Sequence, residues 1–330
     1  MTDLEQMLIP KSERRRAAPP RILRFAIGSI AVPTTLASLL AVLAYVEPQF
    51  DLVANFSPIL LAIAFVTLVA AAAIGRSVVL SIIAATGMIA SAWLMTPDLV
   101  ALLGRLGASP PNGPSLKVIS ANLLASNGDG GAFEEMVRRE QPDILILQES
   151  FGYWRKRLER LSADYPTQAG CADPSECQTV ILSRFPSAGL LQPQNSTFVA
   201  TRLVLPQHLG GGTIEAVSVH LSRPPPIEPQ LKQLAELKAL SSSLSSRAIL
   251  AGDFNATPWA SSIRTLDQTL PLERRTRALF SWPTPFPLAP VDHVYAGRSW
   301  RLASISRGPR IGSDHYPIIA TLVLAEPSAH

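Results

Sequence analysis

The first hundred residues contain three long apolar runs that no charged side chain interrupts. They cover positions 25–46, 56–74 and 77–95, and each is 19 to 22 residues long. A helix of about 20 apolar residues spans the roughly 30 Å hydrocarbon core of a bilayer. The pattern therefore predicts three membrane-spanning helices. Core helices of a large soluble protein are the weaker alternative, because such helices are usually shorter.

Lysine and arginine residues beside these runs predict the orientation of the helices. Six of them lie before residue 25, none lies in the loop 47–55, which holds Glu47 and Asp51 instead, and the next loop holds Arg76. Short cytoplasmic loops carry an excess of Lys and Arg, so the N-terminus should face the cytoplasm. Three spans then predict a multi-pass protein of the cell (inner) membrane, with everything after residue 95 on the non-cytoplasmic side.

From residue 116 onward, short apolar runs alternate with turn residues. The runs expected as strands are 117–121, 144–147, 179–182, 199–205, 213–219, 248–250, 291–295 and 317–324. Segments 133–141 and 227–244 have apolar residues at helical spacing. Many strands with few helices predict a layered α/β domain with at least one large sheet.

A segment rich in proline and glycine separates the apolar half from this domain. Such composition is typical of a linker. The expected organisation is a basic cytoplasmic tail (1–24), a three-helix membrane anchor (25–95), a linker (96–115) and a folded domain (116–330).

The net charge and the two cysteines narrow the class of protein to which this chain can belong. A net charge of +4 is too small to predict a nucleic-acid-binding protein, since such proteins usually gather basic residues on one face. Cys171 and Cys177 lie six positions apart in a loop with proline and glycine nearby. On the non-cytoplasmic side we expect them to form a disulfide. Two unrelated thiols are the alternative, and a metal pair is disfavoured because no further cysteine or nearby histidine completes a site.

Polar residues suited to catalysis stand at the ends of the predicted strands. They are Asn122, Glu149, His220, Asp253 with Asn255, Asp292, and Asp314 with His315. Strand termini converge on one edge of a sheet, where loops present functional groups. The sequence therefore predicts that these side chains form one site.

Seven short motifs resemble, in order, those of the endonuclease/exonuclease/phosphatase superfamily, including its membrane-anchored bacterial members. They are Ser120-Ala-Asn122, Leu147-Gln-Glu149, Leu182-Ser-Arg184, Val219-His220-Leu221, Gly252-Asp253-Phe254-Asn255, Val291-Asp292-His293 and Gly312-Ser313-Asp314-His315-Tyr316-Pro317. This metal-dependent group includes exodeoxyribonuclease III, pancreatic deoxyribonuclease and neutral sphingomyelinases. The resemblance implies a four-layered α/β sandwich, with two mostly antiparallel sheets face to face and helices outside.

The resemblance also implies a divalent metal, Mg²⁺ or Mn²⁺, which carboxylate ligands favour. Glu149 is the expected main ligand. Asn122 would help to fix the metal or the phosphate, and Asp314 would be a second ligand or a partner to the site. Taken alone, a glutamate after a strand is usually solvated, and an asparagine there is no better than a turn residue.

Further residues take catalytic roles by the same resemblance. Asp253 and Asn255 would orient or deprotonate the attacking water and donate to the phosphate, although an Asp-x-Asn turn by itself is often only a backbone cap. His315 is expected to pair with Asp292 and either bind the phosphate or serve as general base. His220 would stabilise the pentavalent phosphorus or protonate the leaving group.

These features predict a membrane-tethered, metal-dependent phosphodiesterase that acts outside the cytoplasm on DNA or on a phospholipid headgroup. A phosphomonoesterase of a soluble polyphosphate and a catalytically silent binding module at the membrane are the alternatives. The basic residues between positions 155 and 160 could contact DNA or lipid headgroups, although such a run is more often a solvated helix face. The sequence indicates no protein partner.

Overall fold

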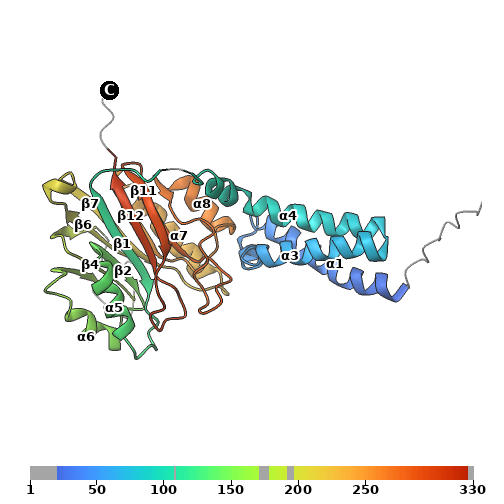
Figure 1. The fold of residues 1–330 in the computed structure, drawn as a ribbon, viewed down its shortest axis with the longest axis horizontal. Coiled ribbons are helices and arrows are strands. Elements are labelled where there is room, and N and C mark those ends of the chain that lie inside the picture. Colours follow the sequence, from blue (N-terminus) through green and yellow to red (C-terminus); the bar gives the residue numbers. More distant parts are fainter. Residues whose placement is uncertain (1–20, 108, 171–177, 192–196, 326–330) are drawn as a thin grey trace, which may run out of the picture.

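A bundle of helices projects from one end of a two-sheet sandwich (Figure 1). The structure, a computed structural model, describes residues 21–107, 109–170, 178–191 and 197–325. The bundle is built from the apolar first hundred residues, and the sandwich is built from the residues that follow. The boundary between the two halves therefore follows the change in composition along the chain.

Three helices of the bundle are long and apolar enough to cross a membrane: Arg21–Leu43, Ser57–Gly75 and Val78–Leu103. They correspond to α1 (Arg21–Leu43), α3 (Ser57–Val69) with the π-helical turn η2 (Ala70–Gly75), and α4 (Val78–Leu103). At the end beside the sandwich, the 3-10 turn η1 (Pro48–Phe50) and the short helix α2 (Asp51–Ala54) join α1 to α3. The predicted spans are thus present as helices.

Small and hydroxyl side chains fill the centre of the bundle, while its large apolar side chains are exposed. Gly87 of α4 lies directly against Thr35 of α1. The Ser91 hydroxyl donates to Ser38 Oγ at 2.9 Å, and Thr35 Oγ1 donates to the carbonyl oxygen of Ile83 at 2.8 Å. Close packing through small residues and interhelical hydrogen bonds is typical of helices that associate within lipid.

Two six-stranded sheets form the sandwich, in the orders β11-β12-β1-β2-β4-β3 and β5-β6-β7-β8-β10-β9. The first sheet contains β1 (Ser115–Asn122), β2 (Ile144–Gln148), β3 (Thr167–Gly170), β4 (Thr179–Ser183), β11 (Trp300–Arg307) and β12 (Ile318–Leu324). The second contains β5 (Ser187–Leu190), β6 (Val199–Val204), β7 (Thr213–His220), β8 (Ile249–Asp253), β9 (Leu272–Arg274) and β10 (Asp292–Gly297). Among the described strands, only β1–β2 and β7–β8 pair in parallel, so both sheets are mostly antiparallel.

Helices cover the outer face of each sheet and complete four layers. Helices α5 (Gly131–Glu140) and α6 (Tyr153–Glu159) pack Phe133 and Trp154 onto the first sheet. Helices α7 (Glu228–Ser241) and α8 (Ser261–Thr269) pack Leu237 and Ile263 onto the second sheet. The 3-10 turn η3 (Gln207–Leu209) joins β6 to β7. An apolar core lies between the sheets. The predicted four-layered α/β sandwich is confirmed.

The segment that joins α1 to α3 is hydrogen-bonded to the sandwich. The two carboxylate oxygens of Asp51 accept the N–H groups of Ser261 at 2.7 Å and Ser262 at 2.9 Å, at the start of α8. A carboxylate there satisfies free N–H groups and complements the helix dipole. Asn55 Oδ1 accepts both the N–H and the hydroxyl of Thr257 at 2.8 Å. The segment between α1 and α3 therefore holds the residues that follow β8.

Helix α4 continues to Leu103, beyond residue 95, where the sequence predicted the end of the third span. Asp98 in this extension accepts two hydrogen bonds from Arg274, at 2.8 and 3.2 Å. Burial alone would lower the pKa of Arg274, but Asp267 and Asp98 outweigh it and raise that pKa. The extension is helical because this buried contact with the sandwich orders residues that the sequence assigned to the linker.

Candidate active site

The predicted site residues gather where the central strands of both sheets end. Asn122 is the last residue of β1, and Glu149 directly follows β2, which runs parallel to β1. His220 and Asp253 are paired residues at the ends of the parallel strands β7 and β8. Asp292 begins the antiparallel strand β10 and lies opposite Asp253. The topology therefore brings together residues that are far apart in the sequence.

Asn122 joins the two sheets at this edge. Its Nδ2 donates to Glu149 Oε1 at 3.0 Å and to Asp253 Oδ2 at 3.1 Å, while its Oδ1 accepts the N–H of Leu124 at 3.0 Å. Glu149 Oε2 accepts the N–H of Ala125 at 2.9 Å. Each carboxylate oxygen has two lone pairs. Glu149 is thus held in position and keeps the capacity to bind a cation.

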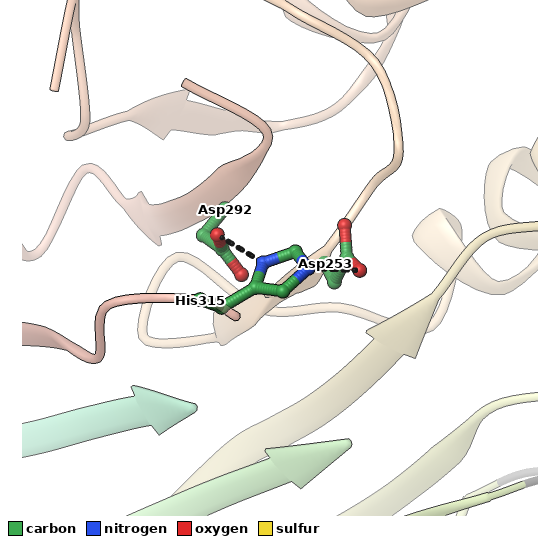
Figure 2. A group of neighbouring side chains, drawn as sticks. All are labelled: Asp253, Asp292 and His315. Carbon is green, nitrogen blue, oxygen red and sulfur yellow. Dashed lines mark hydrogen bonds and ion pairs between the residues drawn. The ribbon is translucent and has the colours of Figure 1, made fainter. Parts of the chain in front are cut away.

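The imidazole of His315 lies between two buried carboxylates (Figure 2). Its Nδ1 is 2.9 Å from Asp292 Oδ2, a hydrogen-bond distance, and its Nε2 is 3.6 Å from Asp253 Oδ2. Nε2 has no hydrogen-bond partner within the described part of the chain. The predicted contact between Asp292 and His315, which are 23 positions apart, is confirmed.

The carboxylates of Asp292 and Asp253 favour the protonated form of His315, which lies in a row between them. Burial alone would lower the pKa of His315, but Asp292 and Asp253 outweigh it and raise that pKa to about 10. Burial raises the pKa of Asp292, and the positive charge of His315 opposes that rise. At neutral pH the imidazole is therefore positively charged in the absence of a metal ion.

The turn after β8 positions Asp253. The N–H of Asn255 donates to Asp253 Oδ1 at 2.8 Å, and Asn255 Nδ2 donates to the carbonyl oxygen of Leu221 at 2.8 Å and to Asp253 Oδ2 at 3.3 Å. The Nδ2 group of Asn255 thus donates to protein atoms and holds the turn in place. His220 Nε2 is 3.7 Å from Asp253 Oδ2, too far for a hydrogen bond. The His220 side chain is 21% exposed, so it can reach a bound substrate.

A pocket of about 530 Å³ borders these residues. Its lining includes Leu124, Glu149, His220, Arg223, Asn255 and Asp314. Leu124, Glu149 and Asn255 have φ values of +58°, +53° and +47°. A left-handed backbone is uncommon for residues other than glycine and costs about 1–3 kcal/mol, and such residues cluster at functional sites. Backbone strain therefore marks the same pocket as the polar side chains do.

Comparison with known proteins assigns a family to this architecture. Residues 119–315 match the model of the Endonuclease/Exonuclease/phosphatase family. The matched segment is more than half of the chain. The chain belongs to this family. Members of the endonuclease/exonuclease/phosphatase family are phosphoesterases and nucleases, that is, hydrolases of phosphate esters. No curated protein matches the chain.

Solved structures are similar to this chain at low sequence identity. D. rerio TDP2, complexed with a single-strand DNA product, is 14% identical over 63% of this chain and 98% of its own, with a TM-score of 0.52. An endonuclease/exonuclease/phosphatase protein from Beutenbergia cavernae DSM 12333 is 20% identical over 64% of this chain and 72% of its own, with a TM-score of 0.48. Sphingomyelinase C from Streptomyces griseocarneus is 17% identical over 64% of this chain and 100% of its own, with a TM-score of 0.45.

The donor atoms beside the pocket fit a divalent cation such as Mg²⁺ or Mn²⁺. Glu149 and Asp314 line the same pocket, and carboxylate oxygens are the ligands these ions prefer. Asp314 Oδ2 accepts the Nε1–H of Trp282 at 3.0 Å, which orients the carboxylate. Asn122 contacts Glu149 directly, so the predicted ligands Glu149, Asn122 and Asp314 all belong to this site.

A second arrangement of possible ligands lies beside the first. Among the described residues, Asp253, Asp292 and His315 form a group whose ligand atoms lie within 4.8 Å of one another. The hydrogen bond between His315 and Asp292 already engages two of these ligand atoms, whereas the carboxylate of Glu149 lines the pocket. Both groups therefore offer ligand atoms that could hold a divalent cation.

Sequence reasoning did not single out Arg223. Its Nε donates to Asn255 Oδ1 at 3.2 Å, and its guanidinium lies 5.5 Å from the ring centre of Trp282. The signal available in the sequence was its place three residues after His220, at the end of a predicted strand. The predicted disulfide between Cys171 and Cys177 lies outside the described residues.

Proposed function

We propose that this protein is a membrane-tethered phosphodiesterase that depends on Mg²⁺ or Mn²⁺ and acts on the non-cytoplasmic side of the cell membrane. The observation that carries the proposal is the buried row Asp292, His315 and Asp253 beside a pocket lined by Glu149. Titratable residues in mutual contact at a cleft are the usual means of moving protons during hydrolysis. The three long apolar helices support the membrane tether.

Glu149, with Asn122 and Asp314, would hold the metal ion. When bound, the ion neutralises charge on the phosphoryl oxygens in the transition state. Asn122 positions Glu149 through its Nδ2, and the N–H of Ala125 fixes the second carboxylate oxygen. The carboxylate is thus preorganised for an ion before substrate arrives.

The acid and base work falls to the neighbouring side chains. Asp253, held by Asn122 and Asn255, orients the attacking water and accepts its proton. His315, kept charged by Asp292, donates Nε2–H to a phosphoryl oxygen. His220, the more exposed histidine, stabilises the pentavalent phosphorus or protonates the leaving oxygen.

The test uses the full-length protein in detergent, with bis-p-nitrophenyl phosphate as a soluble diester. Hydrolysis should require Mg²⁺ or Mn²⁺ and stop with EDTA. Glu149→Gln removes a charge but little volume, so it should raise the Mg²⁺ concentration for half-activity or abolish turnover. Glu159→Gln, at an exposed carboxylate of α6, serves as the matched control and should behave as wild type. Hydrolysis that persists in EDTA, or an unaltered Glu149→Gln enzyme, contradicts the proposal.

A further inference from the structure

A second cavity, of about 220 Å³, lies between the anchor and the sandwich. The anchor contributes Leu52, Asn55, Phe56, Pro58 and Ile59, at the start of α3 and the segment before it. The sandwich contributes mainly apolar side chains from the loop before β10, among them Trp282, Leu288 and Val291. Neither half of the molecule forms this cavity alone, and its walls are mostly apolar.

This apolar cavity adjoins the catalytic pocket. Arg223 and Asn255 line both of them. Arg223 stacks over Trp282, a wall of the apolar cavity, and donates to Asn255, which holds Asp253. A positive charge therefore stands between an apolar compartment and the catalytic groups. A ligand that carries a phosphate next to an apolar chain matches this arrangement.

The cavity also lies beside one end of the candidate membrane spans. Ile59 belongs to the first turn of the candidate span Ser57–Gly75, and Phe56 directly precedes that span. Near the same end of the bundle, the rings of Tyr45 and Trp93 pack 5.5 Å apart, and such aromatic residues are enriched at membrane–water interfaces. With the proposed topology, the cavity therefore lies at the non-cytoplasmic end of the spans, next to the lipid.

The loop that walls the cavity carries large apolar side chains on its surface. Phe286 is 79% exposed and Leu288 is 59% exposed. These two side chains add exposed apolar surface beside the mostly apolar cavity. Contact with lipid would cover both side chains.

We propose that the substrate of this enzyme is a membrane phospholipid, a segment of one acyl chain of which occupies the apolar cavity while its phosphodiester lies between Arg223 and the catalytic pocket. The inference rests on the proposed phosphodiesterase function and specifies its substrate class. A nucleic acid offers no apolar chain for the cavity. A soluble phosphate ester leaves the cavity unused.

The first experiment compares two substrates on the full-length protein. The protein is reconstituted in vesicles of phosphatidylethanolamine and phosphatidylglycerol, and release of lipid headgroups is measured beside hydrolysis of bis-p-nitrophenyl phosphate. Leu288→Asp places a charge at the wall of the cavity, which an acyl chain cannot solvate. The ratio of phospholipid to soluble-diester turnover should fall at least about tenfold.

Leu190→Asp is the matched control, because Leu190 is also 59% exposed but lies on the edge strand β5 and lines neither pocket. Its ratio should equal that of wild type. An unchanged ratio in Leu288→Asp, or an equal fall in Leu190→Asp, overturns the inference.

A second experiment reads binding without turnover. A phosphatidylglycerol with a photoreactive diazirine in its acyl chain should label the peptides around residues 52–59 and 286–291, also in Glu149→Gln. Labelling elsewhere, or hydrolysis of plasmid DNA with no labelling of these peptides, overturns the lipid inference and leaves the phosphodiesterase proposal standing. No hydrolysis of any diester contradicts the proposed function, while the labelling still decides whether the cavity holds an acyl chain.

Discussion

The charge of His315 depends on the two carboxylates that flank it. Asp292 receives a hydrogen bond from Nδ1, which leaves Nε2 as the atom that faces Asp253. The imidazole is almost completely buried, so water cannot compensate for the loss of either carboxylate. Asp292 and His315 should therefore act as a unit, in which the carboxylate fixes both the orientation of the ring and the atom that carries the reactive proton.

Substitution of either member of this pair should impair turnover. His315→Ala should lower the turnover of bis-p-nitrophenyl phosphate by roughly 10²-fold or more, the scale of a lost general acid or base. Asp292→Asn should lower it in the same direction, because the amide no longer supports the charged imidazole. The double variant should be little worse than His315→Ala, since effects within one unit are not additive.

Steady-state kinetics on the purified variants provide the measurement. His208→Ala, at an exposed histidine outside the site, is the control and should match wild type. If both single variants turned over the diester at the wild-type rate, His315 would have no part in the chemistry.

Among the elements, the close approach of β7 and β8 decides where the catalytic residues lie. Gly252 has a φ of +154°, and a Cβ at this position would lie 1.8 Å from the carbonyl oxygen of Val219. The two parallel strands can therefore pair at this register only with glycine at position 252. The same pairing sets His220 beside Asp253.

Gly252→Ala should force β8 away from β7 and displace Asp253. We expect a loss of about 1–3 kcal/mol of stability, the range for overpacked interiors, together with a large fall in turnover. Gly170→Ala in β3 is the control, because a Cβ there would meet its nearest neighbour at 3.8 Å, an ordinary contact distance. The thermal unfolding midpoint and the turnover of both variants test this, and equal behaviour of the two would show that the approach of the strands is not limiting.

Sequence reasoning missed the strands β3, β5, β9 and β11 and the helix α8, and for two of these elements the structure shows the reason. Strand β11 pairs with β12 through a register shift between Leu302 and Ser304, which interrupts the alternation of apolar and polar residues that identifies a strand. Helix α8 has no side chain of its own as an N-terminal cap and is capped by Asp51, about 210 positions earlier. A sequence pattern within a short window shows neither the register shift of β11 nor the distant cap of α8.

At the scale of the whole molecule, specific contacts hold the N-terminal helical bundle against the sandwich. Asp51, Asn55 and Asp98 each make hydrogen bonds to the sandwich, and Asp51 and Asp98 are almost fully buried. Breaking a buried ion pair by removing one partner typically costs about 3–5 kcal/mol. The position of the active site relative to the helical bundle is therefore set by specific contacts. A flexible tether would let the active site move relative to the bundle.

The orientation of the molecule in a membrane can be tested by fusions. A reporter that is active only outside the cytoplasm should be active when fused after His330 and inactive when fused after Arg76, because basic segments beside membrane spans favour the cytoplasmic side. A reporter that works only in the cytoplasm provides the control and should show the opposite pattern. Reversed results would invert the orientation and place Cys171 and Cys177 in a reducing compartment, where a disulfide is disfavoured.

The sequence by itself determined the elements whose signal is local. Composition alone predicted the three apolar helices, because a bilayer demands about 20 consecutive apolar residues. Short apolar runs between turn residues predicted the central strands, and short motifs predicted the polar residues at their ends. Buried central strands are uniformly apolar and motif residues are contiguous, so a short window is enough to find them.

Only the tertiary structure decided which of these residues meet. The contact of Asp292 with His315, the bridge from Asn122 to Asp253 and the cavity between the anchor and the sandwich all join segments that are far apart in the chain. Helix α4 likewise extends beyond the apolar run, where Asp98 meets Arg274. Such contacts depend on sheet order and on packing between layers, and neither is encoded in the hydrophobic period of any one segment.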